Sequence, residues 1–425
     1  MRICGGFAAR ASRLALFALV CLAPQLVRAD FTVTSVLPAI ETGARAVDAH
    51  DSVAYVVDDG VTAVDVSDVN APRVIASLTD IDLRGCSSVA AYAAANGEKR
   101  LAVACAGSNA LVVVDANAPR DGLRVIGAAQ DDTALSGISS VVVKGTLAFV
   151  TAPGVQRVVS LDLAADASPR ILSFVALSGA DAVSLAADDH VAVAAGYAHG
   201  GGRVTILSYV PSGVMMKVGS VKDGRLGGRL RDARAFPADP SVIFAATDAA
   251  GGSVVVVNAT ARARPSLAVG LQAQGRAAAT TPLAAEDEAG ADAASDWTPN
   301  GHRSLAGAAA LAMGPNRVAY VAGADAGAVV GLDATDPRRP ILAHVISDAN
   351  LRGVADLCAQ GGRAAAAAAA VASVPANEEG ADASSAAKMS PTGGPAVLYA
   401  VVPGASKMLV LRDAGGSAVV ANDEL

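Results

Sequence analysis

Short apolar runs that end in a polar residue recur along this chain at nearly regular intervals. Each has the form Val/Leu-x-x-Val/Leu-Asp or a close variant, and the copies are 61–65, 111–115, 158–162, 254–258, 329–333 and 408–412, with a degenerate copy at 203–208. Where no insertion intervenes, successive copies lie about 45 to 50 residues apart, which is the length of a four-stranded propeller blade. The spacing therefore predicts an all-β repeat protein, a β-propeller.

The strands of one unit follow from its hydrophobic pattern. In the first unit we predict strands at 44–49, 53–57, 61–66 and 73–78, because β-branched residues dominate there and Gly, Asp and Asn separate the runs. The second and third strands are almost continuously apolar rather than alternating, which is typical of strands covered on both faces. Neighbouring blades would supply that cover. The repeats contain no amphipathic helices, which argues against a helical solenoid.

A proline lies seven residues after the polar residue of the third strand in four units. The pairs are Asp65/Pro72, Asp162/Pro169, Asn258/Pro265 and Asp333/Pro340. Proline cannot donate to a sheet, so it favours the start of an edge strand, and the outer strand of a blade is such an edge. We expect a turn between the two residues, in which Asp or Asn accepts hydrogen bonds from nearby backbone amides.

The third-strand run and the turn after it resemble the LVIVD-repeat family. The copy Leu111-Val112-Val113-Val114-Asp115 is close to the five letters that name the family, and the ending of the first unit at Pro72-Arg73 looks like the end of that family's unit. The resemblance covers most of residues 31–425. It implies a β-propeller, and since most members have no assigned biochemical activity, it implies more about fold than about function.

The unit count predicts seven four-stranded blades, whose innermost strands begin near Gly43, Gly85, Gly137, Gly179, Asp232, Gly307 and Gly353. Residues 31–36 precede the first innermost strand and have no unit of their own. We predict that they form the outer strand of the seventh blade and so close the ring. The alternative gives that place to residues 418–421 and leaves 31–36 as an unpaired edge. Six and eight blades are the alternative counts.

Both ends of the chain resemble targeting signals. Arginines precede the apolar run 14–23, and small residues follow at 27–29, so we predict a signal peptide over 1–29 and a mature domain over 30–425 without a membrane span. The last four residues, Asn422, Asp423, Glu424 and Leu425, resemble the retention tetrapeptide of the endoplasmic reticulum. We expect a resident of the reticulum lumen; since the first of the four departs from the motif, a secreted protein is the alternative.

Two stretches interrupt the repeat, and the charge is acidic. Residues 273–304 and 363–395 are rich in alanine and polar residues and offer little to bury, so we predict low-complexity loops, either drift in composition or part of a binding face. The net charge is −7; removal of 1–29 takes away four arginines and no acids, which leaves 29 basic and 40 acidic residues and a charge of −11. An acidic domain argues against a nucleic-acid partner.

Three of the five cysteines lie in the predicted mature domain. Cys86 begins an innermost strand and Cys105 ends the strand predicted to pair with it, so the two are candidates for a disulfide. Cys358 would then be a free buried thiol or an intermolecular one, and buried structural cysteines throughout is the alternative. Asn258-Ala259-Thr260 is the one N-glycosylation sequon that we single out, on a turn after a third strand.

The sequence has little that points to chemistry. The five histidines show no metal spacing, and no Cys-x-x-Cys, HExxH, phosphate-binding or nucleophile-elbow motif is present, so we expect no cofactor, no metal site and no catalytic residue. Asp48, Asp181 and Asp356 begin innermost strands of different blades and offer little basis for catalysis.

One constellation could bind a ligand. Arg84, Arg231 and Arg352 each precede an innermost strand, in Leu-Arg-Gly or Leu-Arg-Asp. Equivalent positions in a propeller cluster at one channel mouth, so three guanidinium groups could bind an anion, carboxylate or phosphate. Acids such as Asp82 and Asp232 could instead neutralise them in structural pairs.

Two functions remain in competition. The first is a non-enzymatic scaffold of the secretory pathway that holds a protein partner on its rims and insertions. The second is a hydrolase or lactonase-like enzyme with its site at the channel mouth. The scaffold is favoured, because no motif demands chemistry, although this fold hosts many functions.

Overall fold

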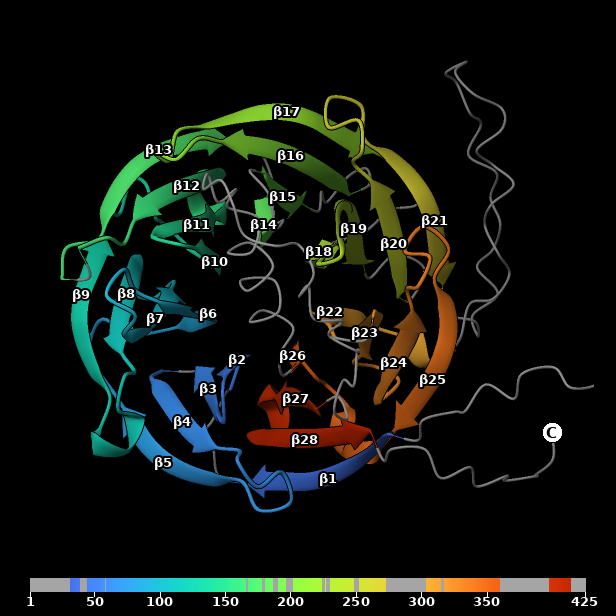
Figure 1. Cartoon of the computed structure of the whole chain (residues 1–425), viewed down its shortest axis with the longest axis horizontal. Helices are drawn as coiled ribbons and strands as arrows, with labels where there is room; N and C mark the ends of the chain where they lie inside the picture. Colours follow the sequence, from blue (N-terminus) through green and yellow to red (C-terminus); the bar gives the residue numbers. More distant parts are fainter. Residues whose placement is uncertain are drawn as a thin grey trace, which may run out of the picture.

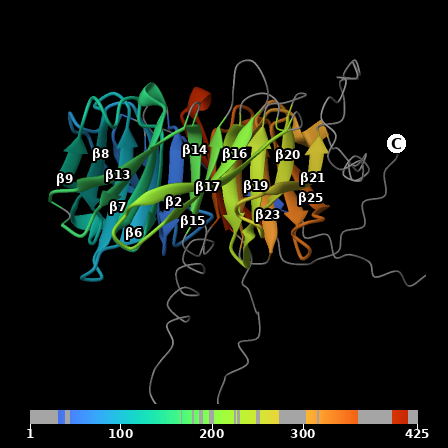
Figure 2. The same ribbon diagram turned by 90° about the horizontal axis from the view of Figure 1, so that it is seen from above.

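The computed structural model describes residues 31–38, 44–57, 59–165, 167–177, 180–185, 190–195, 202–223, 226, 230–247, 252–272, 303–314, 317–359 and 397–413. These residues form seven antiparallel four-stranded sheets arranged as blades in a ring; we call the centre of the ring, which the innermost strands surround, the channel (Figure 1). Figure 2 shows the same ring from its edge, with strands of neighbouring blades side by side. The predicted seven-bladed β-propeller is confirmed. No helix in this described part is long and apolar enough to cross a membrane.

The blades follow one another along the chain, and each runs from the channel outward. The innermost strands are β2 (Ala46–His50), β6 (Cys86–Ala93), β10 (Ser140–Lys144), β14 (Ala180–Leu185), β18 (Leu230–Phe236), β22 (Ala308–Met313) and β26 (Asp356–Ala359). The second strands are β3 (Val53–Val57), β7 (Lys99–Cys105), β11 (Leu147–Ala152), β15 (His190–Ala195), β19 (Asp239–Thr247), β23 (Val318–Gly323) and β27 (Val397–Val402). The third strands are β4 (Val61–Asp65), β8 (Ala110–Asp115), β12 (Arg157–Asp162), β16 (Arg203–Tyr209), β20 (Ser253–Asn258), β24 (Ala328–Asp333) and β28 (Lys407–Asp413). The outer strands are β5 (Arg73–Leu78), β9 (Arg124–Gln130), β13 (Arg170–Ala176), β17 (Met215–Lys222), β21 (Ser266–Gln272), β25 (Ile341–Ser347) and β1 (Phe31–Pro38).

The core is divided among the junctions between blades. The apolar runs 147–150 of β11 and 101–105 of β7 are buried throughout, as their pattern predicts, and the polar Thr151 and Arg100 are buried beside them. The buried apolar residues form seven clusters, and each cluster joins two adjacent blades, including blade 7 with blade 1. Since an isolated sheet could not cover both faces of its middle strands, closing the ring is part of building the core.

The strand β1 closes the ring. It pairs antiparallel with β28, from Phe31 opposite Asp413 to Pro38 opposite Lys407, and so supplies the outer strand of blade 7. Val33 and Val36 pack against the cluster between blades 6 and 7. The predicted closure by the N-terminal strand is confirmed. The outer position of blade 7, which the alternative gave to residues 418–421, is occupied by β1.

The repeated polar residue at the end of the third strand organises the following turn. Asp65 Oδ1 accepts hydrogen bonds from the backbone N–H and the hydroxyl of Ser67, at 3.0 and 2.6 Å. The residues Asp115, Asp162, Asn258 and Asp333 accept equivalent bonds from the residue two positions on. The four repeated prolines each directly precede the first residue of an outer strand. The expected turn is therefore confirmed.

Every outer strand carries a β-bulge at the same place. The register shifts opposite the same step of each third strand, for example between Ala63 and Val64 in blade 1 and between Ser160 and Leu161 in blade 3. The other five blades show it too, β1 with the shift between Val33 and Ser35. A bulge twists an edge strand and interrupts its row of unpaired backbone groups, which discourages pairing with another sheet.

Candidate functional site: the central channel

The innermost strands leave one edge unpaired toward the channel, and side chains of the preceding blade satisfy it. Asp356 Oδ2 accepts a hydrogen bond from the backbone N–H of Val47 at 3.0 Å, and Asp232 Oδ2 accepts one from Leu311 at 3.0 Å. Ser88 Oγ accepts the equivalent bond from Val141 at 3.2 Å. Each bond joins one blade to the next, since a buried N–H group needs a partner.

A half-buried arginine connects two of these carboxylates across the channel. Arg234 Nε lies 3.1 Å from Asp232 Oδ2 on its own strand β18, and Arg234 Nη2 lies 3.9 Å from Asp356 Oδ1 on β26. The side chain of Arg234 is 22% exposed, while those of Asp232 and Asp356 are 13% and 15% exposed. Because β18 belongs to blade 5 and β26 to blade 7, the guanidinium group bridges blades that do not follow one another.

A third carboxylate joins this cluster at the junction of blades 7 and 1. Asp48 is 1% exposed, and its Oδ2 accepts a hydrogen bond from the backbone N–H of Ala91 in blade 2 at 2.8 Å. Its Oδ1 lies 3.4 Å from the thiol Sγ of Cys358, which can donate to it. We call Asp48, Asp232, Arg234, Asp356 and Cys358 the channel cluster.

The charges of the channel cluster do not balance. Three carboxylates face one guanidinium group. Burial raises the pKa of Asp356 to about 6, against the attraction of Arg234 and with help from the negative charge of Asp232. For Arg234, burial alone would lower the pKa, but Asp232, Asp356 and Asp48 hold it above its ordinary value. Asp356 therefore changes charge near neutral pH.

We expect Asp356→Asn to change the pH dependence of stability. Asp356 has a folded-state pKa of about 6 against an ordinary value of 3.8, so the folded protein binds the proton more tightly between these values. Its contribution to the free energy of unfolding is greatest below pH 4 and falls by about 2 to 3 kcal/mol as pH rises to 7. The wild-type minus Asp356→Asn difference, measured by urea unfolding from pH 4 to 7.5, should fall accordingly. Asparagine can still accept from Val47.

Asp131 supplies a control of opposite sign. Hydrogen bonds from Thr133 and Ala134 lower the pKa of this exposed carboxyl, so its stabilising effect is lost as pH falls. The difference between wild type and Asp131→Asn should therefore grow only as pH rises toward about 5, and it should stay level from there to 7.5, where the Asp356 contribution falls. Parallel stability curves for wild type and Asp356→Asn would contradict the assignment of Asp356.

The three arginines of the predicted anion site lie in blades 2, 5 and 7, but Arg231 is not equivalent to the other two. Arg84 and Arg352 precede β6 and β26, each followed by a glycine with positive φ. Arg231 lies within β18 at the register shift between Leu230 and Asp232. The sequence misled us because Leu230-Arg231-Asp232 looks like the turn motif, whereas the buried leucine at that turn in blade 5 is Leu226, whose N–H bonds to Asp223 O.

The side chains of all three arginines are exposed. Exposure alone does not test whether they bind an anion together, so the anion site at the channel mouth stays a prediction. Arg84 Nε donates to Ile81 O at 3.1 Å. Of the acids considered as neutralising partners, Asp232 pairs with Arg234.

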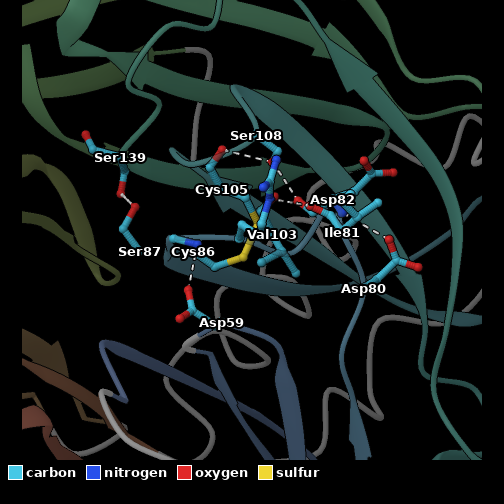
Figure 3. The surroundings of a disulfide bond; sticks show 12 residues. Asp59, Asp80, Ile81, Asp82, Cys86, Ser87, Val103, Cys105, Ser108 and Ser139 are labelled. Atoms are coloured by element: carbon cyan, nitrogen blue, oxygen red, sulfur yellow. Dashed lines mark hydrogen bonds between the residues drawn. A yellow bond between two sulfur atoms is a disulfide. The ribbon is translucent and has the colours of Figure 1, made fainter.

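A disulfide joins the first and last residues of a strand pair in blade 2. Cys86 of β6 lies opposite Cys105 of β7, their sulfur atoms are bonded, and both residues are fully buried (Figure 3). The turn beside it is held by Ser108 Oγ, which donates to Asp82 O at 2.6 Å, and by Asp59 Oδ1, which accepts from Gly85 N at 2.9 Å. Cys358 is buried and is not part of a disulfide.

The remaining predicted residues are placed as follows. Asn258 is half-buried at the end of β20, and its Oδ1 accepts from Thr260 N at 3.0 Å and Thr260 Oγ1 at 2.7 Å, so the sequon coincides with the repeated turn. The side chain of Asp181, the segments 1–29 and 363–395, almost all of 273–304 and the tail Asn422–Leu425 lie outside the described residues.

Sequence reasoning missed Arg234 and the assembly of the channel cluster. It identified Asp48 and Asp356 but took them as scattered, although both lie in the cluster. A usable signal was present: Asp232 and Arg234, and likewise Asp356 and Cys358, stand two positions apart in strands whose other residues are mostly apolar. Positions two apart share a face of a strand. No set of three or more His, Cys, Asp or Glu side chains within the described ranges could hold a metal ion.

The fold and the channel define a seven-bladed β-propeller with a charged, hydrogen-bonded channel wall. No protein-family model matches the sequence, and no curated protein sequence matches it. The structure is similar to hydrazine synthase of Kuenenia stuttgartiensis (TM-score 0.59, 14% identity, 89% of this chain and 97% of that one). It is also similar to virginiamycin B lyase of Staphylococcus aureus (0.55, 9%, 90% and 99%). Sqt1 of Chaetomium thermophilum bound to the N-terminus of ribosomal protein L10 is similar too (0.50, 14%, 76% and 79%). At these identities the likeness shows the fold alone.

Proposed function

We propose that this protein is a non-enzymatic scaffold of the LVIVD type that binds another protein in the secretory pathway. The proposal rests on a contrast between the side chains of the channel and those of the outer strands. The channel carboxylates Asp48, Asp232 and Asp356 are used in bonds between blades, while bulky apolar side chains stand exposed on outer strands. Exposed apolar patches on a rigid ring are typical of protein-binding surfaces.

A similar ring that binds a protein supports the proposal. The Sqt1 structure holds the N-terminus of ribosomal protein L10. Propellers also include enzymes, so this support concerns what the fold can do. The LVIVD assignment is supported by the third-strand run Leu111–Asp115 and by the turn bonds of Asp65 and its equivalents.

The secretory location is supported by three features of the chain. They are the signal-like residues 1–29, the final residues Asn422–Leu425 and the bond between Cys86 and Cys105, since disulfides persist in oxidising compartments.

We expect the protein from native cells to carry the Cys86–Cys105 bond, measured by mass spectrometry after alkylation without reduction. Deletion of 422–425 should divert it to the medium. Retention of the deleted form in cells would contradict a role for the tail.

Proximity labelling in the native cell tests the scaffold. The labelling enzyme is inserted in 273–304, so that both ends stay intact. We expect a reproducible set of lumenal proteins beyond those labelled by a reticulum-targeted enzyme alone. Recovery of only that background would contradict the proposal.

One observation favours a second candidate, an enzyme acting in the channel. Asp356 is a largely buried acid with a pKa of about 6 beside the half-buried Arg234, and perturbed acids of this kind concentrate at catalytic sites. A screen with lactones and phosphoesters tests this. Turnover that is lost in Asp356→Asn would favour the enzyme; turnover that survives this substitution, or no turnover, would argue against it.

A further inference from the structure

Five exposed apolar side chains gather on the outer circumference at blades 3 and 4. Among the described residues, nine large apolar side chains are exposed, and these five are Leu172 (37% exposed), Phe174 (54%), Val210 (50%), Val214 (53%) and Met216 (63%). They come from β13, from the turn before β17 and from β17 itself, which succeed each other on the outside of the ring (Figure 1). We call these five residues the rim patch.

Hydrogen bonds hold the two parts of the rim patch together. The hydroxyl groups of Ser160 and Ser173 donate to Gly213 O at 2.6 and 2.9 Å, and Met215 N donates to Ser173 Oγ at 3.2 Å. The side chain of Leu172 fills the space above Gly213, where an added Cβ would lie 2.3 Å from Leu172 Cδ1. The turn of blade 4 is therefore fixed on the outer strand of blade 3, and the patch is formed in advance of any partner.

Cations border the rim patch. The guanidinium carbon of Arg157 lies 4.3 Å from the centre of the Phe174 ring, and Lys144 Nζ lies 5.9 Å from that of Tyr209. Arg170 is exposed two positions before Leu172, and Lys217 is exposed next to Met216. Two acids lie near these cations: Asp162 stands opposite Arg170 in the register, and Asp131 interacts electrostatically with Arg157, so the four cations still outnumber them. The local charge is therefore positive on a chain whose net charge is −7.

We propose that the rim patch binds an acidic segment of a partner protein that carries bulky apolar side chains. The apolar side chains would pack on Phe174 and Met216, and the carboxylates would meet Lys217 and Arg170. A second copy of the chain using the same patch would bring like charges together, and an anionic membrane would repel the negative ring. The proposal rests on the scaffold function and specifies its partner surface.

Binding of synthetic peptides to the full-length protein tests the surface. The probes are fluorescent peptides of about 12 residues, in which Glu and Asp alternate with Leu and Phe. Matched peptides replace the acids by Lys or the apolar residues by Ser. We expect acidic-apolar peptides to bind, both matched sets to fail, and affinity to fall about 30-fold in Phe174→Ser and about tenfold in Lys217→Glu. Ile341→Ser, at an apolar residue 55% exposed on β25, is the control and should bind normally.

Several outcomes would overturn the rim patch. Acidic-apolar peptides that bind Phe174→Ser as tightly as Ile341→Ser would show that the patch does not hold them, and basic peptides that bind as tightly as acidic ones would show that charge plays no part. Binding to phosphatidylserine vesicles but not to peptides would point to a membrane. A dimer in light scattering that Phe174→Ser dissociates would point to a second copy of the chain. Proximity labelling separates this proposal from the scaffold itself. If the Phe174→Ser protein still labels the lumenal clients, the scaffold function stands and the rim patch is not its binding surface. If the peptides bind the rim patch but no client is labelled, the patch binds peptides and the scaffold function is overturned.

Discussion

A variant that lacks residues 31–38 is expected to lose at least about 5 kcal/mol of unfolding free energy, with a thermal midpoint lower by about 10 °C or more. These residues form β1, which pairs along the whole of β28 and covers the cluster between blades 6 and 7 through Val33 and Val36. Without β1, blade 7 has three strands and an open edge. Thermal unfolding followed by circular dichroism measures the effect.

A peptide supplied in trans gives the control for this deletion. A peptide of residues 31–38 should raise the thermal midpoint of the truncated protein, by an amount that grows with the logarithm of the peptide concentration above Kd, because binding to the folded state stabilises it. The same peptide with Val33 and Val36 replaced by Asp should not, since both side chains pack on the core. An unchanged midpoint in the truncated protein would show that β1 does not hold the ring.

Arg234→Met is expected to cost about 3 to 5 kcal/mol at pH 7.5, because it leaves buried carboxylates without their cation. Asp232 and Asp356 both lie against the guanidinium group, and methionine matches its length without its charge. The cost should shrink at pH 5, where Asp356 is protonated, given its pKa of about 6. Urea unfolding at the two pH values measures both effects.

Arg231→Met is the matched control for Arg234→Met. Arg231 stands three positions earlier on the same strand, and its side chain is exposed, so the change should stay within about 0.5 kcal/mol of wild type. Adding Asp356→Asn to Arg234→Met should recover part of the lost stability, since it removes one of the uncompensated charges. If Arg231→Met and Arg234→Met unfolded at the same urea concentration, the channel cluster would have no energetic role.

The fold could be predicted because short sequence patterns indicate each of its main features. The run Val61–Asp65 and its repeats give the third strands, the following prolines mark the outer edges, and almost continuously apolar strands such as Leu147–Ala152 indicate cover on both faces. The place of residues 31–36 followed from counting, since one outer strand was missing. The bulges left no comparable signal, because Leu172 or Ile126 at a bulge looks like any strand residue.

The channel was harder to predict because its members come from blades far apart in the chain. Asp48 and Cys358 are 310 positions apart and meet only when the ring closes. Their partners depend on the register between neighbouring blades, which no local pattern specifies. The misassigned Arg231 shows the same limit, since a three-residue motif cannot tell a turn from a bulge when the true turn at Leu226 lies four positions earlier.

The pairing of β1 with β28 also sets a waiting time during synthesis. Phe31 leaves the ribosome more than 370 residues before its partner Asp413, which at typical elongation rates is a delay of roughly 20 to 80 s. During that interval β1 has no strand to pair with, and blade 1 lacks blade 7, which covers one of its faces. The nascent chain therefore carries an unfinished edge for most of its translation, and holding that edge apart from other chains is a task for the chaperones of the compartment in which it folds.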